Sequence, residues 1–247
     1  MGAFPLEFVE ARPAYTGAMA TPKQELSPLE PLIGQAVLHL FCKPDGPVDH
    51  RKVVAAERAL VRAGGQMVAI SILGHKADVC FMVLGHDLWQ LRKFQTAIQA
   101  AGLAVVDSYF SLTEISEYAK GVPEQMRQAR LYPQLPPEGM TAFCFYPMSK
   151  RRSENHNWFA LPFEQRKALM MGHGKSGREF HGRVLQVVTG STGLDDWEWG
   201  VTLFGVHPDD LKDCVYTMRF DEASTLYADF GPFYTGMVGT IAQVVPH

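Results

Sequence analysis

The apolar segments of this 247-residue chain follow one order of strands and helices twice, and that repetition limits the folds available to it. In the first half the expected order is strand, helix, strand, strand, helix, strand, over residues 36–42, 47–64, 66–74, 77–85, 86–102 and 103–115. The same order returns over 140–147, 161–174, 182–190, 196–206, 208–220 (with a possible helical extension over 221–230) and 232–241. We therefore predict the α+β class: two fused ferredoxin-like βαββαβ units whose antiparallel sheets pack together or close into a dimeric α+β barrel.

The rest of the chain divides into two segments that we expect to lie outside these units. Residues 1–34 contain five prolines and little periodicity, which predicts an extended arm, with a neighbouring subunit as its candidate contact. Residues 118–139 are rich in proline and poor in apolar periodicity, which predicts a long connecting loop. The two units then cover 35–117 and 140–247, and the second is the richer in aromatic and charged residues.

Composition argues against several classes of protein. The chain has 23 Lys plus Arg against 26 Asp plus Glu, a net charge of -3, so a main role in holding nucleic acid is disfavoured. The "KRR" run at 150–152 is more often a solvated turn, or a docking point for a small polyanion, than a nucleic-acid patch. Four cysteines far apart in the sequence form no metal-ligand spacing and favour a reducing cytoplasm. We expect neither a signal peptide nor a membrane span, because no apolar stretch is long enough.

Two short motifs resemble well-known catalytic patterns but lack the context that those patterns need. The spacing of Tyr146 and Lys150 resembles the catalytic pair of short-chain dehydrogenases, yet Pro147 favours extended backbone at the tyrosine and no Gly-rich turn offers a dinucleotide site. The "HGKSG" segment at 173–177 resembles the end of a P-loop, but its first glycine would fall at Leu169.

Among the nine histidines, His173 has a distinctive setting. In the helix that we expect Pro162 to open and Gly174 to close, His173 lies three and four residues after Met170 and Leu169 and hence on their apolar face. A histidine on an apolar face is more often a satisfied core residue than a ligand. Neighbouring residues make the ligand interpretation stronger.

The second unit brings several groups of complementary chemistry into the same stretch of sequence. They are a phenol at a strand end, cations, tryptophans and an amide: Tyr146, Lys150, Arg178, Trp158, Trp197, Trp199 and Gln186. Such a set suits a flat, apolar, carboxylated ligand such as an iron porphyrin.

Longer motifs in this half carry a family resemblance. With "CFYPMSKRR", "NWF", "LMMGHGKSGREFHGRVLQ", "GLDDWEWGVTLF" and "YTMRFDEASTLYADFGPFYTG" in this order, the chain resembles the chlorite dismutase-like superfamily and, more narrowly, the coproheme decarboxylases. The match is dense from about Arg130 to Gly236, weaker through "GHKAD" and "SYFSLTEISEY", and absent in the N-terminal arm.

The resemblance implies a homopentamer of ferredoxin-like halves and a specific reaction. Iron-coproporphyrin III (coproheme) would be substrate and redox cofactor together. Two of its propionates would be decarboxylated to carbon dioxide with hydrogen peroxide as the oxidant, and the product would be haem b. This would be the last step of coproporphyrin-dependent haem biosynthesis in the cytoplasm, with possible transient contact with a ferrochelatase. The alternatives are a haem-binding or transfer protein without catalysis, and a chlorite dismutase or peroxidase.

Residue by residue, the resemblance assigns the central roles to three side chains. His173 matches the proximal iron ligand, and neutral imidazole is the form that binds iron. Tyr146 matches the redox-active tyrosine, whose phenoxyl radical abstracts hydrogen from the propionate β-carbon. Lys150 matches the lysine that orients a propionate and supplies charge or a proton, its alternative being a surface cation.

The resemblance also implies a set of porphyrin contacts. The positions that match propionate contacts are Arg130, Tyr109, Met148, Arg178 and Ser224. The loop with Arg130 is two residues longer than the family pattern, and Ser224 occupies a variable position. Gln186 stands on the distal side, where true chlorite dismutases place an arginine, and therefore favours the decarboxylase.

Some residues near these motifs admit a second interpretation. Asp195, Asp196 and Glu198 could form an acidic metal site, but we favour a structural hairpin with the acids on one face and the tryptophans on the other. We take Trp158 as a pocket wall rather than a redox relay, and Glu222 as either a surface carboxylate or a partner for His173.

Overall fold

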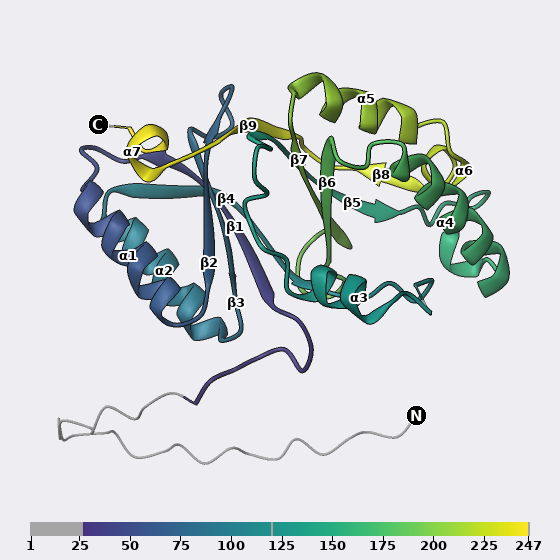
Figure 1. Ribbon diagram of the computed structural model, residues 1–247, viewed down its shortest axis with the longest axis horizontal. Coiled ribbons are helices and arrows are strands. Elements are labelled where there is room, and N and C mark those ends of the chain that lie inside the picture. Colours follow the sequence, from purple (N-terminus) through teal and green to yellow (C-terminus); the bar gives the residue numbers. More distant parts are fainter. Residues whose placement is uncertain (1–26, 120, 247) are drawn as a thin grey trace, which may run out of the picture.

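The structure, a computed structural model, describes residues 27–119 and 121–246 (Figure 1). Its strands are β1 (Ala36–Pro44), β2 (Gln66–Ile72), β3 (Val79–Gly85), β4 (Leu103–Thr113), β5 (Ala142–Lys150), β6 (Val184–Gly190), β7 (Trp199–Gly205), β8 (Ala228–Phe230) and β9 (Tyr234–Gly239). Its α-helices are α1 (His50–Arg62), α2 (Leu88–Ala100), α3 (Glu124–Leu131), α4 (Phe163–Arg178), α5 (Pro208–Met218), α6 (Glu222–Thr225) and α7 (Ile241–Val244). A single 3₁₀ turn covers Trp158–Ala160.

All the described strands belong to one antiparallel sheet that closes on itself. The order is β7-β6-β4-β1-β3-β2-β9-β5-β8, and β7 also pairs with β5, which completes the ring. Strand β8 continues the edge of β5 next to β9. The predicted α+β class with ferredoxin-like units is confirmed, and the two expected sheets are one continuous barrel sheet.

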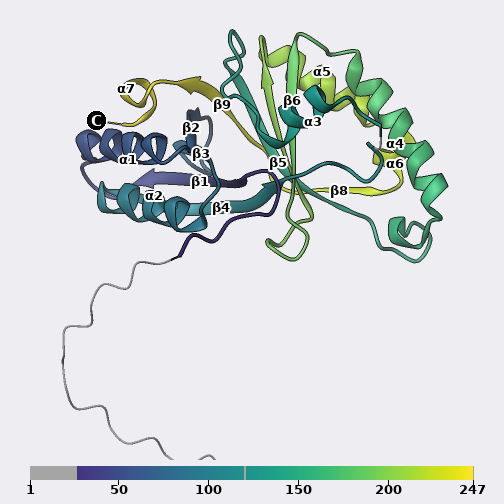
Figure 2. The same ribbon diagram turned by 60° about the horizontal axis from the view of Figure 1, so that its bottom comes forward.

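The helices lie outside the barrel in two groups. In the N-terminal half, α1 and α2 lie side by side and pack on β1 and β3 through a continuous apolar core (Figures 1 and 2). In the C-terminal half, α4, α5 and α6 cover the opposite end of the molecule. Alternation along β5 decides which side chains reach these helices: Phe143 and Phe145 lie in the barrel interior, and Tyr146 lies with the helix-covered cluster.

Two expectations about the helices are wrong. The segment 118–139 contains α3, which the periodicity missed because Leu131 is its only buried residue. Helix α4 does not end at Gly174 but continues to Arg178, since Gly174 keeps helical backbone and does not take the positive φ of a glycine cap. Lys175 and Arg178 in the last turn complement the helix dipole.

The possible extension of the fifth helix over 221–230 is also wrong. Helix α5 ends at Met218, and Asp221 starts the separate helix α6 by accepting a hydrogen bond from the backbone N–H of Ser224 at 3.1 Å. Strand β8 follows directly. Of the expected N-terminal arm, 1–26 lie outside the described residues, and 27–34 contain no helix or strand. No helix in the described part of the chain is long and apolar enough to cross a membrane.

Candidate functional site

Strand β5 presents three of the predicted site residues on one face. Tyr146, Met148 and Lys150 are two residues apart, so their side chains leave the strand on the same side. The Tyr146 ring is 7% exposed and stacks on Phe233 with ring centroids 4.5 Å apart. Burial raises the pKa of this phenol, so it stays protonated. Within the described residues its hydroxyl has no hydrogen-bond partner, which leaves it available to a ligand.

Lys150 is a buried cation at the end of the same strand. Its ammonium donates a hydrogen bond to the carbonyl oxygen of Ala223 at 3.1 Å and lies 4.1 Å above the centroid of the Trp158 ring. Burial lowers the pKa of Lys150 to about 8, although the charges of Asp221 and Glu198 oppose that shift. No described carboxylate forms an ion pair with the ammonium, so it can still attract an anionic group.

His173 lies on α4 with one ring nitrogen already engaged. Its Nδ1 is 3.0 Å from Asp221 Oδ2, and the Ser224 hydroxyl donates a hydrogen bond to the same carboxylate oxygen at 3.0 Å. Burial alone would raise the pKa of Asp221, but the hydrogen bonds and charge of His173 and the bonds of Ser224 outweigh it, and the pKa is lowered. An ionised Asp221 takes the Nδ1 proton as a hydrogen bond, which directs the Nε2 lone pair away from it and toward a metal.

The short helix α6 links these two groups. Ala223 binds Lys150 through its carbonyl, while Asp221 and Ser224 on either side hold His173. Asp221 is the N-cap of α6, so one carboxylate both starts the helix and orients the imidazole. Of the two interpretations of Glu222, surface carboxylate or partner of His173, the structure supports the first, because Glu222 is exposed. The Asp-x-x-Ser pattern at 221–224 marks Asp221 as the start of a helix but carries no signal of its contact with His173.

Apolar and aromatic side chains surround the cluster formed by Lys150, His173, Asp221 and Ser224. One group joins Trp158, Tyr227 and Ala223 with Leu169 and Met170 of α4. Helix α4 packs mainly on α5 and α6, and none of its residues is buried. Its His173 face therefore overlies an apolar region that also contains one buried cation. Such a site can hold a metal through imidazole and a carboxylate through ammonium, which fits an iron porphyrin with propionates.

Comparison with known proteins decides the family. The model of the family described as chlorite dismutase matches residues 50–239, well over half of the chain. The chain belongs to the chlorite dismutase family.

Two relatives illustrate how this family member compares with named proteins. It is 38% identical over 234 residues to a coproheme decarboxylase from Staphylococcus carnosus, covering 85% of this chain and 93% of that enzyme. It is also 43% identical over 189 residues, 70% of this chain, to a protein from Natronomonas pharaonis whose name describes it as heme-binding. The match spans only 31% of that longer relative.

Two solved structures resemble this chlorite dismutase family member in fold. A heme-binding protein from Thermus thermophilus superimposes with a TM-score of 0.77 at 37% identity, over 87% of this chain and 96% of that one. A mutant chlorite dismutase from Candidatus Nitrospira defluvii gives a TM-score of 0.70 over 86% and 94%, at only 19% identity. The second likeness shows the shared fold alone.

Three more predicted residues lie on the helix-covered side of this chlorite dismutase-family barrel. Met148 packs in the apolar cluster that contains Tyr146. Gln186 of β6 points its amide at two sulfur atoms, Cys214 Sγ at 3.3 Å and Met218 Sδ at 3.5 Å. Arg178 is exposed in the last turn of α4, with no ion-pair partner among the described residues. These positions are compatible with a ligand between α4 and the sheet.

Two predicted residues are not brought to this group. Tyr109 is 3% exposed inside the barrel, where its hydroxyl bonds to Ser191 and its ring lies 5.3 Å from that of Phe145. It therefore lies on the opposite face of the sheet from Tyr146, and its assignment as a propionate contact stays a prediction from the resemblance. Arg130 is exposed at the end of α3, and no described hydrogen bond connects it to the cluster.

The "DDWEWG" segment forms the predicted hairpin, between β6 and β7, which confirms the structural interpretation. Strand β7 begins only at Trp199, so the expected alternation of faces before it is wrong. Asp195 accepts a backbone hydrogen bond from Phe110 at 2.9 Å. Trp197 packs against the barrel core and Trp199 donates to Glu114, so neither joins Trp158 beside Lys150.

Proposed function

We propose that this protein is a coproheme decarboxylase, which uses hydrogen peroxide to remove two propionates from iron-coproporphyrin III and releases haem b. The observation that carries the proposal is the pairing of a buried phenol and a buried ammonium on one face of β5, beside a histidine whose Nδ1 is held by a carboxylate. The relative from Staphylococcus carnosus, matched over 85% of the chain, supports the same reaction.

The chain offers separate groups for the iron and for the carboxylates of the substrate. His173 would bind the iron through Nε2, with Asp221 holding the ring and increasing its basicity. Lys150 would bind the propionate that reacts, while Arg178 and Ser224 contact others and Met148 and Gln186 line the porphyrin. Arg130 and Tyr109 remain propionate contacts predicted from the resemblance alone. The bound iron, with peroxide, supplies the oxidising power.

The side chains of the protein would direct the oxidation to the β-carbon of a propionate. For each propionate, R–CH2–CH2–COOH and H2O2 become R–CH=CH2, CO2 and two H2O. Tyr146 would lose its phenolic hydrogen atom and then recover one from the propionate β-carbon. Carbon dioxide leaves with loss of one further electron, and a vinyl group remains. A phenol with a raised pKa suits this role, because proton and electron leave it together.

Lys150 would fix the carboxylate in place during hydrogen transfer. An ammonium near the carboxylate holds the β-carbon within reach of the phenol, and its lowered pKa lets it supply a proton near neutral pH.

Two rival functions remain outcomes of the test: a haem-binding protein without catalysis, and a chlorite dismutase or peroxidase. The cytoplasmic location, the homopentamer and the transfer of substrate from a ferrochelatase stay predictions from the resemblance.

Replacing the phenol tests the proposal. Tyr146→Phe should bind ferric coproheme with nearly unchanged affinity, since the cations and His173 remain, yet retain all four propionates after peroxide is added. Tyr216→Phe is the control, because Tyr216 is 64% exposed on α5. Porphyrin mass after titration is the readout. Normal haem b from Tyr146→Phe would remove the tyrosine from the reaction.

A further inference from the structure

The outer layer of the N-terminal half has a charge opposite to that of the whole chain. Helices α1 and α2 lie side by side there, at the opposite end of the molecule from α4 and α6 (Figures 1 and 2). They contain six cations and one carboxylate, a net charge of +5, in a chain whose net charge is -3. The cations are Arg51, Lys52, Arg58, Arg62, Arg92 and Lys93, and all are exposed. The positive charge is therefore concentrated on one face.

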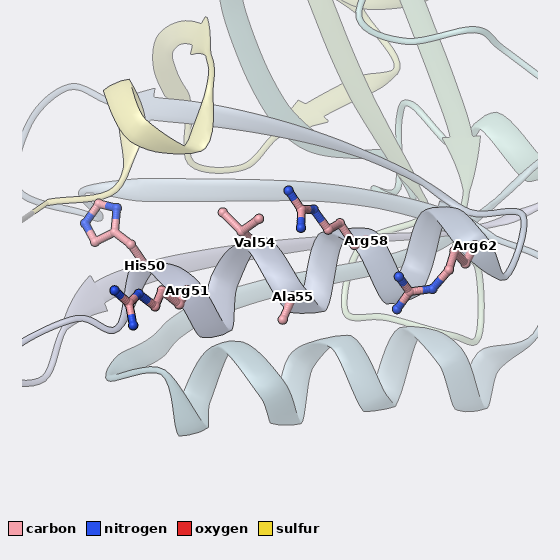
Figure 3. A pocket seen from close by; sticks show the side chains of 6 residues that line it. All are labelled: His50, Arg51, Val54, Ala55, Arg58 and Arg62. Carbon is pink, nitrogen blue, oxygen red and sulfur yellow. The ribbon is translucent and has the colours of Figure 1, made fainter.

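Three of these arginines lie on the side of α1 that faces away from the core. Val53, Ala56 and Leu60 are the buried side of α1. At 100° per residue, Arg51, Arg58 and Arg62 fall on the opposite side and form one ridge. Figure 3 shows this ridge and the hollow that the arginines line together with Val54 and Ala55. None of the three has an ion-pair partner among the described residues.

The neighbouring helix adds a tryptophan to the same face. Leu91, Phe94 and Ile98 are the buried side of α2, and Trp89 falls opposite to them, 38% exposed. Lys93 follows one turn later on the outward side. More than a third of this aromatic side chain is therefore open to solvent on the side of α2 that also presents cations. Its apolar ring and N–H group suit the boundary between lipid headgroups and acyl chains.

We propose that the outer face of α1 and α2 is a peripheral binding surface for an anionic phospholipid bilayer. The arginine ridge attracts headgroup phosphates, the hollow beside Ala55 admits them, and Trp89 anchors the face at the interface. Two helices lying side by side give a broad surface. Recognition of a nucleic acid duplex requires an element that projects into a groove, and this surface presents none. This inference does not rest on the proposed function, so each can fail alone.

Flotation of the full chain with lipid vesicles tests the surface. The protein should float with vesicles of phosphatidylcholine and phosphatidylglycerol but not with phosphatidylcholine alone, and rising salt should release it. The triple variant Arg51→Glu, Arg58→Glu, Arg62→Glu should partition roughly 100-fold more weakly, because each cation near an anionic surface contributes about five-fold. The matched control, Lys167→Glu, Lys175→Glu, Lys212→Glu on α4 and α5, makes the same change in net charge and should bind normally.

A second variant and three results keep the proposal falsifiable. Trp89→Ala, which keeps every charge, should weaken partition several-fold, and circular dichroism verifies that each variant is folded. Equal binding to neutral vesicles, or an equal loss in the control variant, would overturn the proposal. So would stronger binding to duplex DNA than to anionic vesicles. A changed oligomeric mass in the arginine variant would show instead that a second copy covers this face.

Discussion

The two halves of the barrel share one order of strands and helices but fill the space under their helices differently. In the N-terminal half, α1 and α2 each bury three apolar side chains against the sheet. In the C-terminal half, α4 buries none; it contains an imidazole held by a carboxylate of α6, and β5 presents a phenol and an ammonium. The C-terminal half thus has polar and charged groups beneath its helices where the N-terminal half has an apolar core.

The largest expected difference between the two halves is in how much a core substitution lowers the free energy of unfolding. Phe94 is 3% exposed in the core beneath α2, so Phe94→Ala should lower the free energy of unfolding by about 3–5 kcal/mol. Leu169→Ala on α4 removes a side chain that is only partly buried and should cost less than about 2 kcal/mol. Chemical denaturation of the protein without porphyrin measures both. Equal costs would show that α4 is packed as firmly as α2.

The buried ammonium should make the C-terminal half sensitive to pH. Because the pKa of Lys150 is lowered to about 8 from 10.5, the unfolded chain binds this proton more tightly, and the folded state is destabilised below pH 8 by up to about 3 kcal/mol. The penalty decreases as pH rises from 8 to 10.5 and is absent above that. Lys150→Met should therefore be the more stable protein at pH 7, with the difference shrinking toward pH 10.

Denaturation of both proteins between pH 7 and pH 10 checks this prediction. Lys167→Met is the control, because Lys167 is a partly exposed lysine on α4 whose ion-pair partner among the described residues is Glu164. A stability difference between wild type and Lys150→Met that does not change with pH would contradict the burial of a charged Lys150.

The carboxylate on α6 should control the affinity for porphyrin. Asp221→Ala leaves Nδ1 of His173 without its acceptor and should weaken binding of ferric porphyrin by roughly 10–100-fold, as measured by absorbance titration. Loss of the N-cap adds a stability cost of about 1 kcal/mol. The neighbouring Glu222→Ala should bind normally, and equal weakening in both variants would mean that α6 acts only through its fold.

The smallest expected effect is that of Tyr109→Phe, a substitution on the interior face of the sheet. Tyr109 donates to or accepts from Ser191 inside the barrel, so Tyr109→Phe should lower the free energy of unfolding by about 1 kcal/mol and leave porphyrin affinity unchanged. Parallel denaturation and porphyrin titration separate the two effects. A loss of affinity would support the predicted contact of Tyr109 with a propionate.

Periodicity was sufficient to predict the fold of each half but not the closure of the barrel. The apolar pattern of β1, β3, α1 and α2 follows from their buried faces and placed these elements within a few residues. The pairing of β7 with β5 joins strands more than fifty residues apart and leaves no local signal. Helix α3 escaped because a helix with one buried residue has no apolar stripe to detect.

The candidate site was predictable only in part along β5, because the expected strand ended at 147 and β5 continues to Lys150. Tyr146, Met148 and Lys150 share a face because of the period of two along β5, which any extended segment would give. Asp221 was missed because its contact with His173 depends on how α6 packs on α4, a tertiary arrangement. The interior position of Tyr109 was not predictable, because a resemblance gives a position in the sequence but not the face of the sheet.

Mass spectrometry of the porphyrin tests the central claim most directly. Purified protein loaded with ferric coproheme is titrated with hydrogen peroxide, and the porphyrin mass is followed at each addition. The account predicts two successive losses, each equal to one carbon dioxide and two hydrogen atoms, ending at haem b. Coproheme that keeps its mass, or bleaches without losing a propionate, would contradict it.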